Sequence, residues 1–388
     1  MNSRQVYLDI AGRMHSLYRN LIDYPPQGYR FISGGTGWDS ASSSISRISS
    51  IYSFQQKVLG RLFPINLAKA YIEKSKRPPR GTALTYSAGH IVFRQEPWVV
   101  DLECVTQLAG GSISHLKRYS GLIQQALASE HCKKVICWTE TEKKTFLANL
   151  DCRGFEDKLT AVYLAIPPQS FEKIKKDRIK LLFISSLNMR GSFDLKGGKE
   201  VLEAFARLRK QYDNIELTIR SDVSPEIKAR CEDLPGLKLI DRIIPREELE
   251  NEFKTADIFL FPAHTTPGLA ILEAMSYELP VITTDVRANA ELVTDGRTGF
   301  LVSGSPHVPY YAEGYIPQWG TPQFDRAIRK TDPAIVDELV AKTVTLIENP
   351  DLRRQMGKAG REQVEKGKFS VEQRNKKLKD IFDEAIQG

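Results

Sequence analysis

The stretch HTTPGLAILEAM, from His264 to Met275, contains residue types that could bind a nucleoside diphosphate. It follows the apolar run DIFLF, which predicts a strand, and its Pro267 and Gly268 suit the first turn of a helix. The free N–H groups at such a helix start, together with the helix dipole, favour an anionic diphosphate. Glu273, about a turn and a half into the helix, could accept hydrogen bonds from ribose hydroxyls. The stretch therefore predicts a nucleotide site on a strand, loop and helix.

A longer series of motifs continues from the same helix. The sequence reads EAM at residues 273–275, then a Pro-Val strand at 280–281, EL at 291–292 and DGRTGFLV at 295–302. This order over about forty residues resembles the retaining glycosyltransferases of the GT-B fold (glycosyl transferases group 1), the broad family that includes sucrose and glycogen synthases. The match is good over residues 130–388 and holds only in outline before them.

The resemblance implies an α/β protein of the GT-B fold, with two Rossmann-like domains whose parallel sheets face each other across a cleft. The alternation of short apolar runs with helix-length amphipathic stretches along the chain indicates the same class. We expect an N-terminal acceptor-side domain at residues 1–167 and a domain that binds the nucleotide sugar at 168–370. A final helix at 371–388 is expected to pack back on the first domain, as it does in the family.

The resemblance also implies how the donor is held. In the family, a lysine and an arginine neutralise the diphosphate; Lys196 matches the lysine, whereas Ser186 occupies the arginine position. Arg190 is the expected substitute for that arginine, and Arg220 is a second candidate. The residues expected to bind the nucleotide sugar are Gly12, Ser186, Arg190, Lys196, Arg220, Ile243, Thr265, Pro267, Gly268, Leu269, Ala270 and Glu273.

A second departure from the family concerns position 265. There the family has a glutamate that holds hydroxyls of the donor sugar, and this chain has Thr265, which makes one hydrogen bond without charge. Departure of the diphosphate requires fixed positive charge, which Lys196, the nearby arginines and the amides near Gly268 would supply. The substitution therefore predicts a change in which sugar is bound more than a loss of transfer.

Two acidic residues follow a strand in the first half of the chain. Asp101 and Glu103 in PWVVDLECV could orient or deprotonate an acceptor hydroxyl. Alternatively, they could be solvated surface residues or cap a helix. The family's histidine in this region has no direct counterpart, and His90 is the nearest one. An acidic pair of this kind also occurs in metal-dependent glycosyltransferases of another fold, but the motifs of the second half favour a site without a metal.

The positive charge of the chain is unevenly distributed. Residues 1–165 hold 21 Lys and Arg against 13 Asp and Glu, and the remaining residues hold 34 against 35. Such asymmetry indicates an anionic partner for the first half. Basic and apolar residues alternate in the segment from 57 to 80, which suits a helix on an anionic membrane, a nucleic-acid groove, or a core-facing helix with a solvated basic side. Its basic residues are Lys57, Arg61, Lys69, Lys74, Lys76, Arg77 and Arg80.

One connection in the second half is unusually long. The segment from Ser303 to Asp332 interrupts the alternation of strands and helices, which favours a functional role. Its aromatic residues could cover a cleft or stack on a sugar ring, or they could pack the loop onto its own domain. They are Tyr310, Tyr311, Tyr315 and Trp319.

Composition indicates where in the cell the protein is expected to act. The sequence has no run of eighteen apolar residues and no recognisable secretion signal, and its five cysteines form no CxxC pair. We expect a cytoplasmic protein, peripheral on the membrane at most, with no cofactor beyond its donor. The predicted function is retaining, metal-independent transfer of a hexose from a UDP- or GDP-sugar to a glycan or lipid-linked acceptor. The alternatives are sugar transfer to nucleic acid and a catalytically silent scaffold of the same fold.

Overall fold

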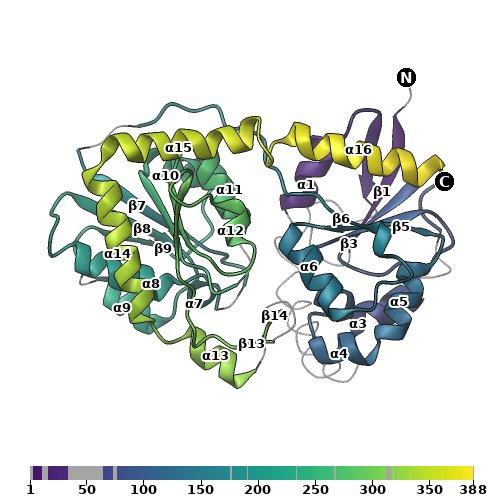
Figure 1. The fold of residues 1–388 in the computed structure, drawn as a ribbon. Helices are drawn as coiled ribbons and strands as arrows, with labels where there is room; N and C mark the ends of the chain where they lie inside the picture. The colour runs from purple at the N-terminus through teal and green to yellow at the C-terminus, as the bar shows by residue number, and fades with distance from the viewer. Residues whose placement is uncertain are drawn as a thin grey trace. The chain divides into compact units, whose positions relative to one another are not determined.

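A computed structural model describes residues 3–10, 16–33, 64–72, 77–174, 177–189, 191–232, 234–265, 268–311, 316–319 and 321–387. The chain divides into two compact units, Met1–Leu164 with Glu372–Gly388, and Ala165–Val371 (Figure 1). Several expected site residues lie outside the described residues or have side chains that are not described. They are Gly12, Lys57, Arg61, Lys69, Lys74, Lys76, Arg190, Pro267, Tyr311 and Tyr315.

The first unit is built on a six-stranded sheet in the order β2-β1-β3-β4-β5-β6, in which every strand pairs in parallel. The chain runs from β1 outward to β2 and then returns beside β1, so the order reverses between β1 and β3. The residues of the central strand β4 are buried, because helices cover a parallel sheet on both faces. The strands are β1 (Arg4–Ile10), β2 (Tyr29–Ser33), β3 (Thr82–Ala88), β4 (Trp98–Leu102), β5 (Cys132–Cys137) and β6 (Leu159–Ala161).

The helices of the first unit come from both ends of the chain. The last helix, α16, seats Phe382 against the rings of Tyr29, Phe31 and Tyr86. The Arg374 guanidinium donates to the Tyr24 carbonyl oxygen at 2.7 Å. The described helices are α1 (Ser16–Asp23), α3 (Ile65–Ile72), α4 (Ile113–Arg118), α5 (Ser120–Ala128), α6 (Glu140–Asn149), α16 (Val371–Gln387) and the 3₁₀ helices Val105–Ala109 and Glu156–Lys158.

The second unit repeats this architecture. Its six parallel strands lie in the order β12-β11-β10-β7-β8-β9, so the order reverses between β7 and β10. The apolar runs DIFLF and GFLV become β10 and β12, and the two parallel sheets confirm the α/β fold predicted from the sequence. The strands are β7 (Ile179–Ile184), β8 (Ile215–Arg220), β9 (Leu237–Ile240), β10 (Ile258–Phe261), β11 (Val281–Thr284) and β12 (Gly299–Val302).

The helices of the second unit flank its sheet, and a small hairpin extends from it. The hairpin consists of the antiparallel strands β13 (Tyr310–Tyr311) and β14 (Ile316–Pro317) and belongs to the long connection after β12. The helices are α7 (Ser192–Leu195), α8 (Gly198–Leu208), α9 (Pro225–Glu232), α10 (Arg246–Thr255), α11 (Leu269–Ser276), α12 (Asn289–Leu292), α13 (Pro322–Ile328), α14 (Pro333–Glu348) and α15 (Pro350–Glu365).

Candidate functional site

The stretch that predicted a nucleotide site lies at the point where the order of the second sheet reverses. In open α/β sheets, ligands bind outside the carboxyl ends of the strands at this point. Lys196 follows β7 and the loop that begins at Pro262 follows β10, the two strands that meet there. We call residues 262–268 the donor loop. The topology therefore brings the lysine and the loop to the same edge of one sheet.

The start of α11 leaves backbone donors without a side-chain cap. Gly268 has an extended backbone, with φ −96° and ψ 171°, and no side chain caps the N-terminus of the helix. The first amides of a helix have no acceptor within it, so those of Leu269 and Ala270 are available to water or to a ligand. Both residues are half-buried. This arrangement suits an anionic group, as the sequence predicted.

Lys196 and Gly197 form the turn between α7 and α8, which we call the lysine turn. Its glycine, which the sequence did not indicate, lets this turn approach the donor loop. Gly197 has a φ of 77°, and a Cβ placed on it would lie 2.3 Å from the Pro262 carbonyl oxygen. The Lys196 ammonium lies 5.5 Å from the centre of the Phe261 ring. A Cβ on Gly268 would lie 4.0 Å from Cζ of that ring. The lysine and the start of α11 thus neighbour the same phenylalanine.

Glu273, in the second turn of α11, is influenced by two positive groups. The carboxyl is half-buried, and burial raises its pKa, while the Arg246 and Arg220 guanidinium groups act in the opposite direction. Arg220 ends β8 and donates to the Ser185 carbonyl oxygen at 3.0 Å. Ile243 is exposed three residues before α10. Arg246, which the sequence analysis missed, is therefore a further cation near the expected ribose contact.

The two positions that depart from the family pattern have different surroundings. The Ser186 N–H donates to the Ser192 hydroxyl at 3.0 Å, and its own hydroxyl accepts from the Asn188 N–H at 3.2 Å. The Thr265 side chain is 1% exposed, and its hydroxyl oxygen has no hydrogen-bond partner among the described residues. Within the described part of the chain, this hydroxyl is therefore a buried and unsatisfied polar group.

In the first unit, Asp101 lies in a buried hydrogen-bonding network. It accepts from the Tyr18 hydroxyl and from the Trp138 indole, both at 3.0 Å. Burial raises the pKa of Asp101 to about 6, although these hydrogen bonds act to lower it. Glu103 is half-buried, and its backbone N–H donates to the Gln107 side chain at 2.9 Å. Both oxygens of Asp101 are thus engaged, and its proposed action on an acceptor stays a prediction.

A second charged cluster, which the sequence analysis did not find, lies where the order of the first sheet reverses. Asp9, at the end of β1, accepts from the Arg94 guanidinium at 2.8 Å and lies 3.5 Å from His90 Nε2. Arg94 also bonds to Glu96 at 2.5 Å. Although burial acts to raise it, contacts with His90 and Arg94 lower the pKa of Asp9 to about 2. The available signal was an aspartate at the end of the first strand.

Comparison with known proteins places this geometry in a family. The family model described as "Glycosyl transferases group 1" matches residues 178–311. D-inositol 3-phosphate glycosyltransferase of Paenarthrobacter aurescens is 29% identical over 145 residues, which cover 35% of this chain and 34% of that protein. This chain thus spans about a third of that relative's length. The capsular polysaccharide biosynthesis glycosyltransferase CapM of Staphylococcus aureus is 23% identical, covering 84% of this chain and 80% of that protein.

Solved structures show the same fold over the whole chain. The HepE protein of Anabaena, crystallised with UDP and glucose, matches with a TM-score of 0.60 at 14% identity, over 98% of this chain and all of that one. TarM matches with a TM-score of 0.57 at 13% identity, over 81% of this chain and 57% of that one. The expected motifs, the two parallel sheets and these matches lead to one conclusion. Residues 178–311 match the group 1 glycosyltransferase family, and the chain has the GT-B fold.

Proposed function

We propose that the protein transfers a hexose from a UDP- or GDP-sugar to a glycan or lipid-linked acceptor, with retention at the anomeric carbon. The observation that carries this proposal is the approach of Lys196 and the uncapped start of α11 to the same Phe261 ring at the reversal point of one sheet, with Glu273 further along the same helix. The comparisons support it, since HepE was crystallised with UDP and glucose, and CapM is named for capsular polysaccharide biosynthesis.

The chemistry follows from the charges at this edge of the sheet. When the sugar–phosphate bond breaks, positive charge develops at the anomeric carbon and negative charge on the departing diphosphate. The Lys196 ammonium and the amides of Leu269 and Ala270 lie where they would stabilise that diphosphate. These groups supply positive charge from the protein itself, so the proposed reaction includes no metal ion.

Binding of nucleotides gives the first test. A ligand that binds only the folded state stabilises it by about 2.7 kcal/mol at a hundred times its Kd. We therefore expect UDP or GDP to raise the unfolding temperature of the second unit, and ADP and TDP to raise it less. Four equal responses, or no response to any of the four, would contradict the proposed donor.

Hydrolysis of the matching nucleotide sugar in the absence of acceptor separates an enzyme from a silent scaffold. An active transferase is expected to release free sugar slowly, because water reaches the reacting carbon in place of the acceptor. Binding without any hydrolysis or transfer would favour the scaffold. A gel shift with DNA or RNA, with glycan as competitor, tests the nucleic-acid alternative.

A membrane surface is the partner that we propose for the first unit. Two large apolar side chains are exposed at the end of α3, Tyr71 at 55% and Ile72 at 73%. Arg77 and Arg80, which follow in sequence, are also exposed. Exposed apolar side chains beside basic ones suit the interface of an anionic bilayer. No helix among the described residues is long and apolar enough to cross a membrane.

Replacing four basic residues of this segment with glutamine is expected to release the protein from vesicles of anionic lipid. Each Lys or Arg near such a surface contributes about 1 kcal/mol, and the attraction weakens with salt. The four are Lys74, Lys76, Arg77 and Arg80. Sedimentation with phosphatidylserine vesicles measures the effect, and the control replaces four exposed basic residues of the second unit, Lys210, Arg242, Arg354 and Lys358. Equal binding by both variants would contradict the membrane contact.

A further inference from the structure

The long connection after β12 is closed at its base. The Ser305 hydroxyl donates to the Asp332 carboxylate at 2.5 Å, which joins the two ends of the segment. The Gly304 N–H donates to Asp285 at 2.9 Å. Asp332 also caps α14 by accepting from the Ala334 N–H at 3.0 Å. The segment 305–332, which we call the strap, is therefore joined at its two ends.

The strap has a small apolar core of its own, which packs against the lysine turn. Val308, Phe324 and Ile328 are buried together, and Leu195 and Tyr310 pack against them. Leu195 immediately precedes Lys196. Lys199, in the first turn of α8, donates to the Arg329 carbonyl oxygen at 2.6 Å. The strap thus contacts the segment that carries the proposed catalytic lysine.

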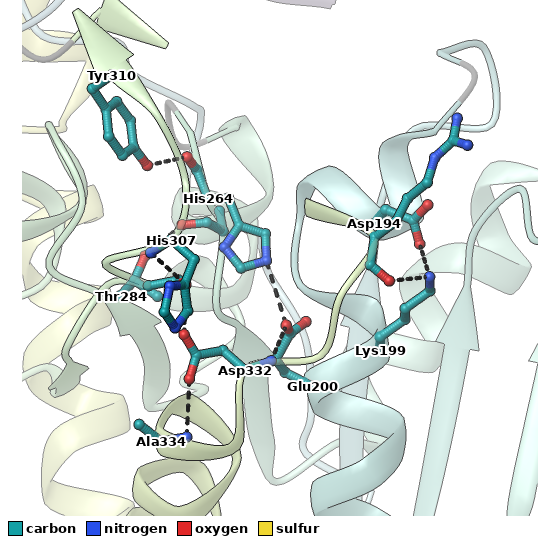
Figure 2. A network of polar contacts seen from close by, with 12 residues as sticks. Asp194, Lys199, Glu200, His264, Thr284, His307, Tyr310, Asp332 and Ala334 are labelled. Atoms are coloured by element: carbon teal, nitrogen blue, oxygen red, sulfur yellow. Dashed lines mark hydrogen bonds and ion pairs between the residues drawn. The ribbon is translucent and has the colours of Figure 1, made fainter. Parts of the chain in front are cut away.

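His264 of the donor loop receives contacts from the same elements. Its N–H donates to the Leu195 carbonyl oxygen at 3.0 Å, and its carbonyl oxygen accepts from the Tyr310 hydroxyl at 2.6 Å. Figure 2 shows the tyrosine reaching the backbone of the loop from the strap. Both backbone polar groups of His264 are therefore hydrogen-bonded, the N–H to α7 and the carbonyl oxygen to the strap.

The His264 side chain lies next to a buried carboxylate. His264 Nε2 lies 3.6 Å from Glu200 Oε1, and both side chains are fully buried. The same Glu200 oxygen accepts from the Asp332 N–H at 3.1 Å, at the far end of the strap (Figure 2). At 3.6 Å this pair is beyond hydrogen-bond distance, and neither ring nitrogen of His264 has a hydrogen-bond partner among the described residues. Tyr310 and Asp332 thus connect the strap to His264 by two routes.

We propose that the strap selects the donor sugar by fixing the conformation of His264, with Tyr310 and Glu200 as its positioning residues. This inference rests on the proposed function. His264 adjoins Thr265, the position at which the family resemblance implies contact with the donor sugar, and the Thr265 hydroxyl is buried without a partner among the described residues. The family resemblance implies a carboxylate at position 265. In this chain, Tyr310 and Asp332 of the strap instead fix the donor loop through their contacts with His264 and Glu200.

The inference predicts an effect on the sugar and not on the nucleotide. Glu273 and the cations Arg220 and Arg246 belong to β8, α10 and the later turns of α11, and none of the contacts of the strap described above involves them. Loosening His264 should therefore weaken binding of a nucleotide sugar and leave binding of the free nucleoside diphosphate unchanged. A role in stability alone would change both affinities or neither.

The test compares Tyr310→Phe with Tyr212→Phe. Each removes one hydroxyl from the second unit, and the Tyr212 hydroxyl bonds to Glu348 at 2.7 Å, outside the donor loop. Since one hydrogen bond contributes about 0.5–1.5 kcal/mol, we expect Tyr310→Phe to weaken UDP-glucose binding by roughly 3- to 10-fold. The Kd for UDP should change less than 2-fold, and Tyr212→Phe should change neither. If GDP is the nucleotide that binds, GDP and GDP-mannose replace these probes.

A second variant addresses the other route. Glu200→Gln keeps an oxygen that accepts from the Asp332 N–H but replaces the carboxylate next to His264 with a neutral amide. It should therefore also raise the Kd for UDP-glucose relative to the Kd for UDP. Equal weakening of UDP and UDP-glucose in both variants, or no change in either ligand, would overturn the inference. If the unaltered protein binds no nucleotide, the proposed function fails instead, so the two failures are distinct.

Discussion

Replacing Lys196 with alanine is expected to lower kcat by about 10²–10³-fold, the usual effect of removing one preorganised group that stabilises developing charge. The Lys196 ammonium neighbours Phe261, as does the start of α11, so its charge would act where the diphosphate departs. The diphosphate carries more charge at the transition state than in the bound donor. Loss of the lysine should therefore reduce kcat more than it raises KM. Initial rates over a range of donor concentrations measure both constants.

Lys228→Ala provides the control for this variant. Lys228 lies in the same unit and pairs with Asp241 at the surface, outside the donor loop. It should leave kcat and KM close to those of the unaltered protein. A rise in KM alone for Lys196→Ala would make Lys196 a binding residue, and unchanged kinetics would remove it from the site.

Replacing Glu273 with alanine is expected to weaken nucleotide binding by about 10- to 100-fold, because hydrogen bonds to a charged acceptor contribute about 1.5–3 kcal/mol. Glu273→Gln keeps one accepting oxygen and should lose less. Burial raises the pKa of Glu273, and the protonated carboxyl accepts poorly from a hydroxyl. Affinity should therefore be greatest above this raised pKa and fall as the pH is lowered through it. Calorimetric titration with UDP at several pH values measures both effects.

The pH series also checks the assignment itself. In Glu273→Gln the acidic decline should disappear, because no group titrates at that position. A decline that persists in this variant would indicate another titrating group, on the protein or on the terminal phosphate of UDP. Binding by Glu273→Ala that equals that of the unaltered protein would show that the ribose is held elsewhere.

The fold and the donor loop could be predicted because their signals are local. DIFLF and GFLV are short apolar runs that become β10 and β12, and Gly268 and Glu273 lie on the strand, loop and helix that the motif indicates. The close approach of Gly197 to Pro262 could not be predicted, because the two residues come together only when β7 and β10 pair. A glycine in a turn has the same sequence signal with or without such a neighbour.

The ion pair of Asp9 and the hydrogen bond of Tyr310 could not be predicted either, because in each case the two partners are far apart in the sequence. Asp9 and Arg94 come from β1 and the connection after β3, and Tyr310 and His264 come from the strap and the donor loop. Such pairs depend on which strands become neighbours and on where a long connection returns. Without an alignment, nothing in the sequence distinguishes Asp9 from any other aspartate at a strand end.

The contribution of α16 to the first unit has a consequence for how the protein is made. The second unit is one continuous stretch, Ala165–Val371, whereas the first requires Glu372–Gly388. Phe382 and Arg374, which pack against rings and backbone of the N-terminal segment, are synthesised after the whole of the second unit. Domains generally fold as units during synthesis, with the N-terminal one first. Here the order is reversed: the second unit can fold on the ribosome, while the first stays incomplete until residues 372–388 have been made. Nascent chains stalled before residue 372 should therefore be cut by protease in their N-terminal part.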